Sequence, residues 1–166
     1  FTSIGDRYGE TKMEERRMGV DGMSDEALRD LLLRTRRIAV VGASDKPGRP
    51  SNGVFRFLLD RGYDAVPVNP LLAGRALHGV ASVAGLEEAA PLDLVDVFRR
   101  SEDAGAVVDE AIRLGARAVW LQLGIVDQAA AERARAAGLL CVMDRCPAIE
   151  WGRLGLPPRI SGAAPG

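Results

Sequence analysis

The sequence IAVVGASDKPGRPSN, residues 38–52, joins an apolar run to a polar loop rich in glycine and proline. The apolar run stops at Gly42, and residues 53–59 resume with apolar side chains at helical spacing. This pattern predicts a buried strand, a tight loop and the start of a helix. Such a junction commonly binds phosphate in α/β proteins, because the first N–H groups of a helix are unpaired and the helix dipole favours an anion.

Strand-like and helix-like segments alternate along the rest of the chain. We expect strands at residues 37–41, 64–69, 92–98, 117–122 and 139–144, and helices at 24–35, 51–61, 101–114 and 127–137. Between the second and third strands we expect a short extended piece at 78–80 and a short helix at 83–89. The strands are nearly continuous apolar runs, which is typical of parallel strands covered by helices on both faces.

These elements predict an α/β fold, a Rossmann-like doubly wound parallel sheet of about five strands in a single domain. We expect the strand order 3-2-1-4-5, with the ligand near the switch between the first and fourth strands. Residues 1–23 are polar and are expected to form a flexible N-terminal arm. Residues 24–155 would form the domain, and residues 156–166 a C-terminal tail.

Composition excludes several classes of function. The net charge of −1 gives no support for nucleic-acid binding, and no apolar run reaches the length of a membrane span. The N-terminus lacks the pattern of a secretory signal, so we expect a cytoplasmic protein. Two cysteines without a CxxC pair and a single histidine indicate neither a disulfide framework nor a metal site. The sequence leaves the oligomeric state open.

Polar, glycine or proline residues follow each of the five expected strands. The carboxyl ends of parallel strands meet at one edge of a sheet, so these tips should converge on a ligand. The tips are Gly42-Ala43-Ser44, Val68-Asn69-Pro70, Phe98-Arg99-Arg100, Gln122-Leu123-Gly124 and Asp144-Arg145-Cys146-Pro147.

The first loop differs from the common nucleotide motifs. Ser44 stands where GxGxxG requires its second glycine, and Asn69 stands where an acidic residue would bind the ribose of NAD. Lys46 is not followed by Ser or Thr in Walker A order. The loop instead offers backbone N–H groups, the Ser44 hydroxyl, and the cations Lys46 and Arg49. These groups suit a pyrophosphate with an additional phosphate.

Five segments together resemble a known family. They are GASDKPGRPS at 42–51, GYDAVPVNP at 62–70, VDVFRR at 95–100, AVWLQLG at 118–124 and MDRCPA at 143–148. In this order they resemble the single-domain CoA-binding proteins, small Rossmann-like relatives of the N-terminal CoA-binding domain of the succinyl-CoA synthetase alpha subunit. The resemblance runs from about Arg37 to Leu154.

The resemblance implies that coenzyme A is the ligand and lies across the strand tips. Asn69 would then tolerate the 3′-phosphate of CoA, which an acidic residue would repel, and Arg75 could help offset its charge. The residues that the resemblance assigns to the phosphates are Gly42, Ala43, Ser44, Lys46 and Arg49; Asn69 and Pro70 would line the adenosine, Phe98 and Arg99 would lie beside the ligand, and Gln122, Leu123 and Gly124 would flank the pantetheine arm.

No catalytic constellation stands out in the sequence. Cys146 is a candidate thiol near the CoA thiol, with packing under the C-terminal segment as its alternative role, and Cys141 is expected in the core. His78 is expected on the surface or in a turn. The three aspartates near strand ends are expected to be caps or loop contacts: Asp93, Asp96 and Asp144.

We therefore expect a protein that binds CoA or an acyl-CoA without catalysis of its own. Two alternatives stay open at this point. One is an NAD(P)-binding redox sensor or oxidoreductase fragment. The other is an enzyme or subunit that handles CoA thioesters and uses Cys146.

Overall fold

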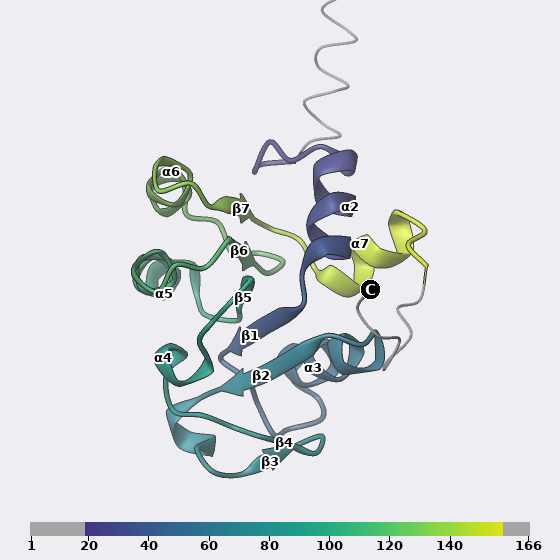
Figure 1. Cartoon of the computed structure of the whole chain (residues 1–166), viewed down its shortest axis with the longest axis vertical. Helices are drawn as coiled ribbons and strands as arrows, with labels where there is room; N and C mark the ends of the chain where they lie inside the picture. The colour runs from purple at the N-terminus through teal and green to yellow at the C-terminus, as the bar shows by residue number, and fades with distance from the viewer. Residues whose placement is uncertain (1–18, 158–166) are drawn as a thin grey trace, which may run out of the picture.

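The computed structural model describes residues 19–157 and has a parallel five-stranded sheet at its centre (Figure 1). Each strand is short and almost fully buried, as the apolar runs predict. The expected α/β fold with about five parallel strands is confirmed. In spatial order the strands are β2 (Asp64–Val68), β1 (Arg37–Val41), β5 (Leu94–Val97), β6 (Ala118–Leu121) and β7 (Leu140–Val142).

Helices cover both faces of the sheet, so alternate residues of each strand enter two separate cores. On β1, Ala39 and Val41 join one core, whereas Ile38 and Val40 join the other. The first core lies under α4 (Leu86–Ala89), α5 (Ser101–Arg113) and α6 (Gln128–Ala136). The second lies under α2 (Asp25–Arg34), α3 (Pro50–Asp60) and α7 (Pro147–Arg153).

Local signals in the sequence set the helix ends. The Ser24 hydroxyl accepts a hydrogen bond from the Ala27 N–H at 3.1 Å, and Asp127 caps α6 in the same way through the Ala130 N–H at 3.0 Å. These caps satisfy amide groups that the first turn leaves unpaired. The helix boundaries predicted from the sequence are therefore correct to within a few residues.

The predicted strand order is wrong. The strand after β2 in the main sheet, β5, pairs with β1 through residues such as Val41 and Val97, on the side opposite β2. In the predicted numbering the order is 2-1-3-4-5, which moves the switch point to the gap between the first and third strands. The position beyond β2 holds only a single parallel bridge between Val68 and Val83.

A small hairpin follows β2 and precedes that bridge. The strands β3 (Ala76–Leu77) and β4 (Val80–Ala81) are antiparallel and meet at a turn. His78 and Gly79 form this turn with φ of 47° and 84°, so the extended piece predicted at 78–80 is wrong and the turn predicted for His78 is correct.

The end of the predicted N-terminal arm is packed into the domain. Asp21 and Met23 are buried, and Asp21 binds the equally buried Arg145 at 2.9 Å. Arg145 also lies 3.5 Å from Glu150 of α7. The predicted arm therefore extends too far toward the C-terminus, since residues 19–23 belong to the packed domain. Residues 1–18 of the arm and 158–166 of the predicted tail lie outside the described residues.

In the part of the chain that the structure describes, no helix is both long and apolar enough to span a membrane.

We predict that Asp21→Asn lowers the free energy of unfolding by about 3 kcal/mol, because it removes one partner of a buried ion pair. Urea unfolding followed by circular dichroism measures the loss. Asp30→Asn is the matched control, since Asp30 pairs with Arg34 at the exposed surface of α2. Equal losses of unfolding free energy in the two variants would show that the buried ion pair stabilises the fold no more than the exposed one.

Candidate functional site

All five strand tips line one cavity of about 860 Å³ at the carboxyl edge of the sheet. This volume is in the range of sites for small ligands and cofactors. The predicted convergence of the tips is confirmed. The lining residues are Gly42, Ala43, Ser44, Asp45, Lys46, Arg49, Pro50, Ser51 and Val54 from the β1–α3 segment, Asn69, Leu71, Leu72 and Arg75 after β2, Phe98, Arg99 and Arg100 after β5, Gln122, Leu123 and Ile125 after β6, and Cys146 after β7.

The predicted ligand residues all line this cavity except Pro70 and Gly124. Pro70 begins a 3-10 turn, Pro70–Leu72. Gly124 donates its N–H to Asp144 Oδ1 at 2.7 Å. Both residues therefore shape loops beside the cavity. Asp144, like Asp93, makes the loop contact predicted for it, since Asp93 accepts from the N–H groups of Arg36 and Arg37.

Gly42 lets the first loop approach the neighbouring strand tip. Its φ is +86°, and a Cβ at this position would lie 2.3 Å from the Phe98 carbonyl oxygen. A side chain cannot fit there without displacing the backbone of the β5 tip. The glycine thus places the loop after β1 directly against Phe98.

Two side-chain amides also fix the loop after β1 through hydrogen bonds to its backbone. Asn69 Nδ2 donates to the Ala43 carbonyl at 2.8 Å, and Asn52 Nδ2 donates to the Ser44 carbonyl at 2.9 Å. The Ser44 hydroxyl accepts from the Lys46 N–H at 3.1 Å. Asn69 also accepts from the Leu71 N–H at 2.9 Å, so its amide is used to fix loops.

The N-terminus of α3 opens into the cavity. Arg49 occupies the cap position without a side-chain hydrogen bond to the helix, Pro50 follows it, and both line the cavity with Ser51. Pro50 has no N–H and the Asn52 N–H donates to the Arg49 carbonyl at 3.0 Å, so the Ser51 N–H is the amide group of this first turn that an anion could bind.

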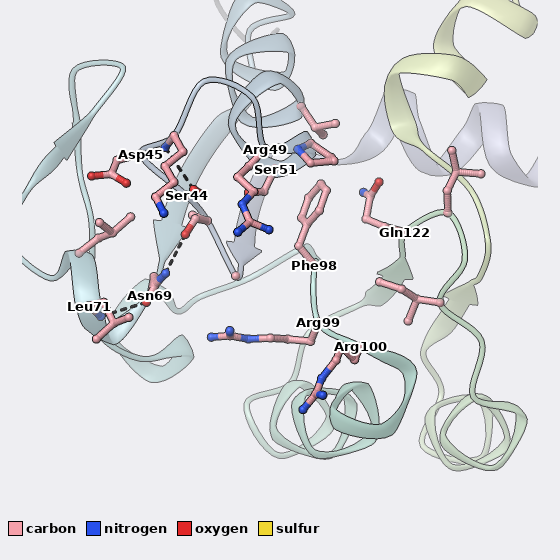
Figure 2. Close-up of a pocket in the computed structure, with 18 of the residues that line it drawn as sticks. Ser44, Asp45, Arg49, Ser51, Asn69, Leu71, Phe98, Arg99, Arg100 and Gln122 are labelled. Carbon is pink, nitrogen blue, oxygen red and sulfur yellow. Dashed lines mark hydrogen bonds between the residues drawn. The ribbon is translucent and has the colours of Figure 1, made fainter.

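Charge divides the cavity into two parts. Cationic side chains come from the tips of β1, β2 and β5, and Figure 2 shows Arg49 and Arg99 on the same side of the Phe98 ring. The lining cations are Lys46, Arg49, Arg75, Arg99 and Arg100, against one carboxylate, Asp45. Arg75 lies 3.6 Å from Asp45, and Arg100 pairs with Glu102 and Asp103. Within residues 19–157, Lys46, Arg49 and Arg99 form no ion pair.

The tips of β6 and β7 form the neutral part. They contribute Gln122, Leu123, Ile125 and Cys146 to the lining. Cys146 is half-buried and also packs against the second core, as its alternative role predicted. Cys141 lies in the core as predicted, and burial raises the pKa of its thiol to about 11.

The role predicted for Asp96 is wrong, because Asp96 is neither a strand-end cap nor a loop contact. It lies inside β5, fully buried, between Val40 of β1 and Trp120 of β6. Its Oδ1 accepts a short hydrogen bond from Gln122 Nε2, and its Oδ2 has no partner. Burial raises the pKa of Asp96 to about 7, although the hydrogen bond from Gln122 lowers it. A charged residue inside an apolar strand was the signal in the sequence.

No group of three or more His, Cys, Asp or Glu side chains gathers at a metal-binding distance among residues 19–157. His78 lies in the β3–β4 turn, where its Nε2 is 3.0 Å from Asn52 Oδ1. The histidine thus supports the residue that holds the first loop.

The fold and the cavity define a doubly wound α/β domain with a partly cationic cavity at its strand tips. Residues 36–152 match the model of a family described as the CoA binding domain, and the chain belongs to this family. The Bacillus subtilis (strain 168) protein YneT is 40% identical over 124 residues, which are 74% of this chain and 90% of YneT.

Solved structures share this fold. A hypothetical protein from Pyrococcus horikoshii OT3 is 37% identical with a TM-score of 0.75, over 81% of this chain and 94% of its own. A Thermus thermophilus protein is 38% identical with a TM-score of 0.75, over 80% of this chain and 99% of its own.

We predict that Asp96→Asn changes how stability depends on pH. The folded carboxyl has a raised pKa, so its contribution to stability is full below pH about 3.8, declines as pH rises to about 7 and is then lost. The variant lacks this loss. Its unfolding free energy minus that of the wild type should rise by about 1.4 kcal/mol per pH unit between about pH 4.5 and 6.5.

Denaturant unfolding at several pH values measures this difference. Asp60→Asn is the control, because Asp60 is exposed on α3. A difference that stays constant with pH in Asp96→Asn would contradict the prediction.

Proposed function

We propose that this protein binds coenzyme A, free or acylated, in the cavity at the strand tips. The division of the cavity into cationic and neutral parts is the observation that carries the proposal. CoA has the same division, since its pyrophosphate and 3′-phosphate lie at the nucleotide end and its pantetheine arm is uncharged. Membership of the CoA binding domain family supports the same ligand.

In this arrangement the phosphates lie against the loop after β1 and the N-terminus of α3. The Gly42 N–H is already bonded to the Val68 carbonyl, so Gly42 contributes by letting the loop approach closely. The backbone N–H groups of Ala43 and Ser44 face the anion, and Lys46 and Arg49 neutralise it. Asn69 borders the adenosine and Pro70 shapes the loop beside it. Phe98 and Arg99 lie at the middle of the ligand.

The pantetheine arm then runs over the tips of β6 and β7. Gln122 and Leu123 flank it there, and the turn at Gly124 sets their position. Cys146 is the one lining residue with a nucleophilic thiol. We place no general acid–base pair beside it and propose that the protein holds CoA without transforming it.

An NAD ligand fits the geometry less well. A dinucleotide site uses a carboxylate at the tip of the second strand to bind the ribose hydroxyls. Asn69 stands there, and its amide is already bonded to Ala43 and Leu71. The lining also carries more cations than a single pyrophosphate requires.

We predict that Lys46→Ala or Arg49→Ala weakens CoA binding roughly tenfold or more, since a hydrogen bond to a charged group contributes about 1.5–3 kcal/mol. Isothermal titration of each variant with CoA measures the loss. Arg56→Ala is the matched control, because Arg56 is an exposed cation of α3 outside the cavity lining.

Unchanged affinity in both cavity variants would remove the phosphate assignment. Titrations of the wild type with NAD and NADP test the alternative ligand class. Binding of either dinucleotide more tightly than CoA would overturn the proposed function.

Cys146 supports a second candidate function, thiol exchange with the bound ligand. Cys146 lines the neutral part of the cavity, over which we propose that the pantetheine arm runs. The Cys146 thiolate would attack one sulfur of a CoA disulfide, form a mixed disulfide and release one CoA thiolate. The CoA disulfide is the oxidant, so electrons balance.

We predict that incubation with CoA disulfide adds the mass of one CoA, less two hydrogens, to the wild type. Intact-protein mass spectrometry without reductant detects the adduct, and dithiothreitol should remove it. Cys146→Ser should stay unmodified, whereas Cys141→Ser should react like the wild type because Cys141 is in the core. An absent wild-type adduct in a protein that binds CoA would leave Cys146 a packing residue.

A further inference from the structure

Asp96 is placed where a carboxyl group costs stability. It is fully buried in the central strand β5, and its Oδ2 has no hydrogen-bond partner. Its neighbours across the sheet are Val40 and Trp120, which offer it no charge. An apolar residue would pack there without a desolvation penalty. Stabilisation of the sheet therefore does not explain why Asp96 is at this position.

The hydrogen-bond partner of Asp96, Gln122, lines the cavity. Gln122 is the first residue after β6, is almost fully buried and lines the neutral part of the cavity (Figure 2). Its Nε2 donates to Asp96 Oδ1. Its Oε1 accepts no hydrogen bond from any of residues 19–157 and is not enclosed. The amide thus spans the distance from the buried carboxyl to the ligand site.

The protonation state of Asp96 decides which end of that amide faces the cavity. An ionised carboxylate only accepts hydrogen bonds, so it holds the NH₂ group of Gln122 and turns the carbonyl oxygen toward the ligand. A protonated carboxyl can donate to the carbonyl oxygen instead. In that state the amide can turn over and present its NH₂ group to the ligand.

We propose that Asp96 is a positioning residue that sets the hydrogen-bonding character of Gln122, and so makes recognition of the pantetheine amides depend on pH. This inference rests on the proposed function, because pantetheine supplies the amide N–H groups that a carbonyl acceptor at Gln122 would bind. Affinity is higher when Asp96 is ionised. Burial raises its pKa to about 7, so the change falls near neutral pH.

Several charged and titratable groups on the elements that cover this face of the sheet bond to other groups or line the cavity. From the α7 side these are Arg145 and Glu150, which bind each other, and the thiol of Cys146. From the α3 side they are Arg49 at the helix start and, beyond α3, the Tyr63 hydroxyl, which donates to the Leu32 carbonyl. Burial is the main cause of the Asp96 shift, and the only other cause is the bond from Gln122.

The test compares CoA affinity in the wild type and in Asp96→Asn from pH 6 to pH 8.5. The phosphates of CoA titrate equally in both experiments, so the ratio of the two dissociation constants isolates Asp96. We expect the wild type to gain about threefold to tenfold over the variant as pH rises through 7, the range of one neutral hydrogen bond. A ratio that is constant with pH would overturn the inference.

Two further measurements separate positioning from a structural role. Adenosine 3′,5′-bisphosphate lacks pantetheine, so its affinity should be the same in wild type and Asp96→Asn at each pH. In a Gln122→Met background, Asp96→Asn should no longer change CoA affinity, because the group it positions is gone. An equal effect on the bisphosphate, or an undiminished effect in the Gln122→Met background, would overturn the inference.

A carboxyl-carbon NMR titration gives a direct readout of Asp96. Linkage requires CoA to lower the pKa of Asp96 if the ionised form binds more tightly. A pKa that is unchanged or raised in the complex would contradict the proposal. Failure of CoA to bind wild type at any pH would instead refute the proposed function, so the two failures are distinguishable.

Discussion

The close approach of Gly42 to Phe98 is the constraint on which the site depends. The Gly42 N–H donates to the Val68 carbonyl at 3.0 Å, and the Phe98 N–H donates to the Val41 carbonyl at 2.8 Å. These two bonds continue the sheet to the tips of β2, β1 and β5. A side chain at position 42 would meet the Phe98 carbonyl and separate the first loop from β5. The first loop and the centre of the cavity would then no longer adjoin.

The polar side chains around this contact serve two different purposes. The side chains of Asn69, Asn52 and Ser44 form hydrogen bonds with backbone groups of the loops. The long cations Lys46, Arg49 and Arg99 make no ion pair with a described residue. A loop fixed in advance loses little conformational entropy when a ligand binds, and unpaired cations do not have to break a bond first. The arrangement favours a polyanion over a ligand recognised by amide groups alone.

The sequence was sufficient for the elements and for the convergence of their tips. Hydrophobic periodicity and caps such as Ser24 are local signals, and they predicted the five strands of the main sheet and the helices α2 to α6 within a few residues, whereas α7 and the β3–β4 hairpin were not predicted. Strand order is not local. It depends on whether the segment after β2 crosses β1, and residues 70–92 contain a 3-10 turn, a hairpin, the bridge at Val83 and a short helix, but no strand of the main sheet. The same reason explains why the buried pair of Asp21 and Arg145 was missed, since 124 residues separate them.

The site shows the same division between local and nonlocal information. The lining residues were predictable because the strand tips carry recognisable residue types, whereas the contact between Asp96 and Gln122 joins strand β5 to the tip of β6 and has no motif. A single Asp within the apolar stretch Leu94–Val97 still marks the position, because a sheet gains nothing from a buried carboxyl with one unpaired oxygen. Its Gln122 partner lies at the boundary between core and cavity. Through the Gln122 amide, the protonation state of the buried Asp96 would change the hydrogen bonding inside the cavity. This proposed coupling gives a functional reason for a carboxyl group at a position where an apolar residue would pack without a desolvation penalty.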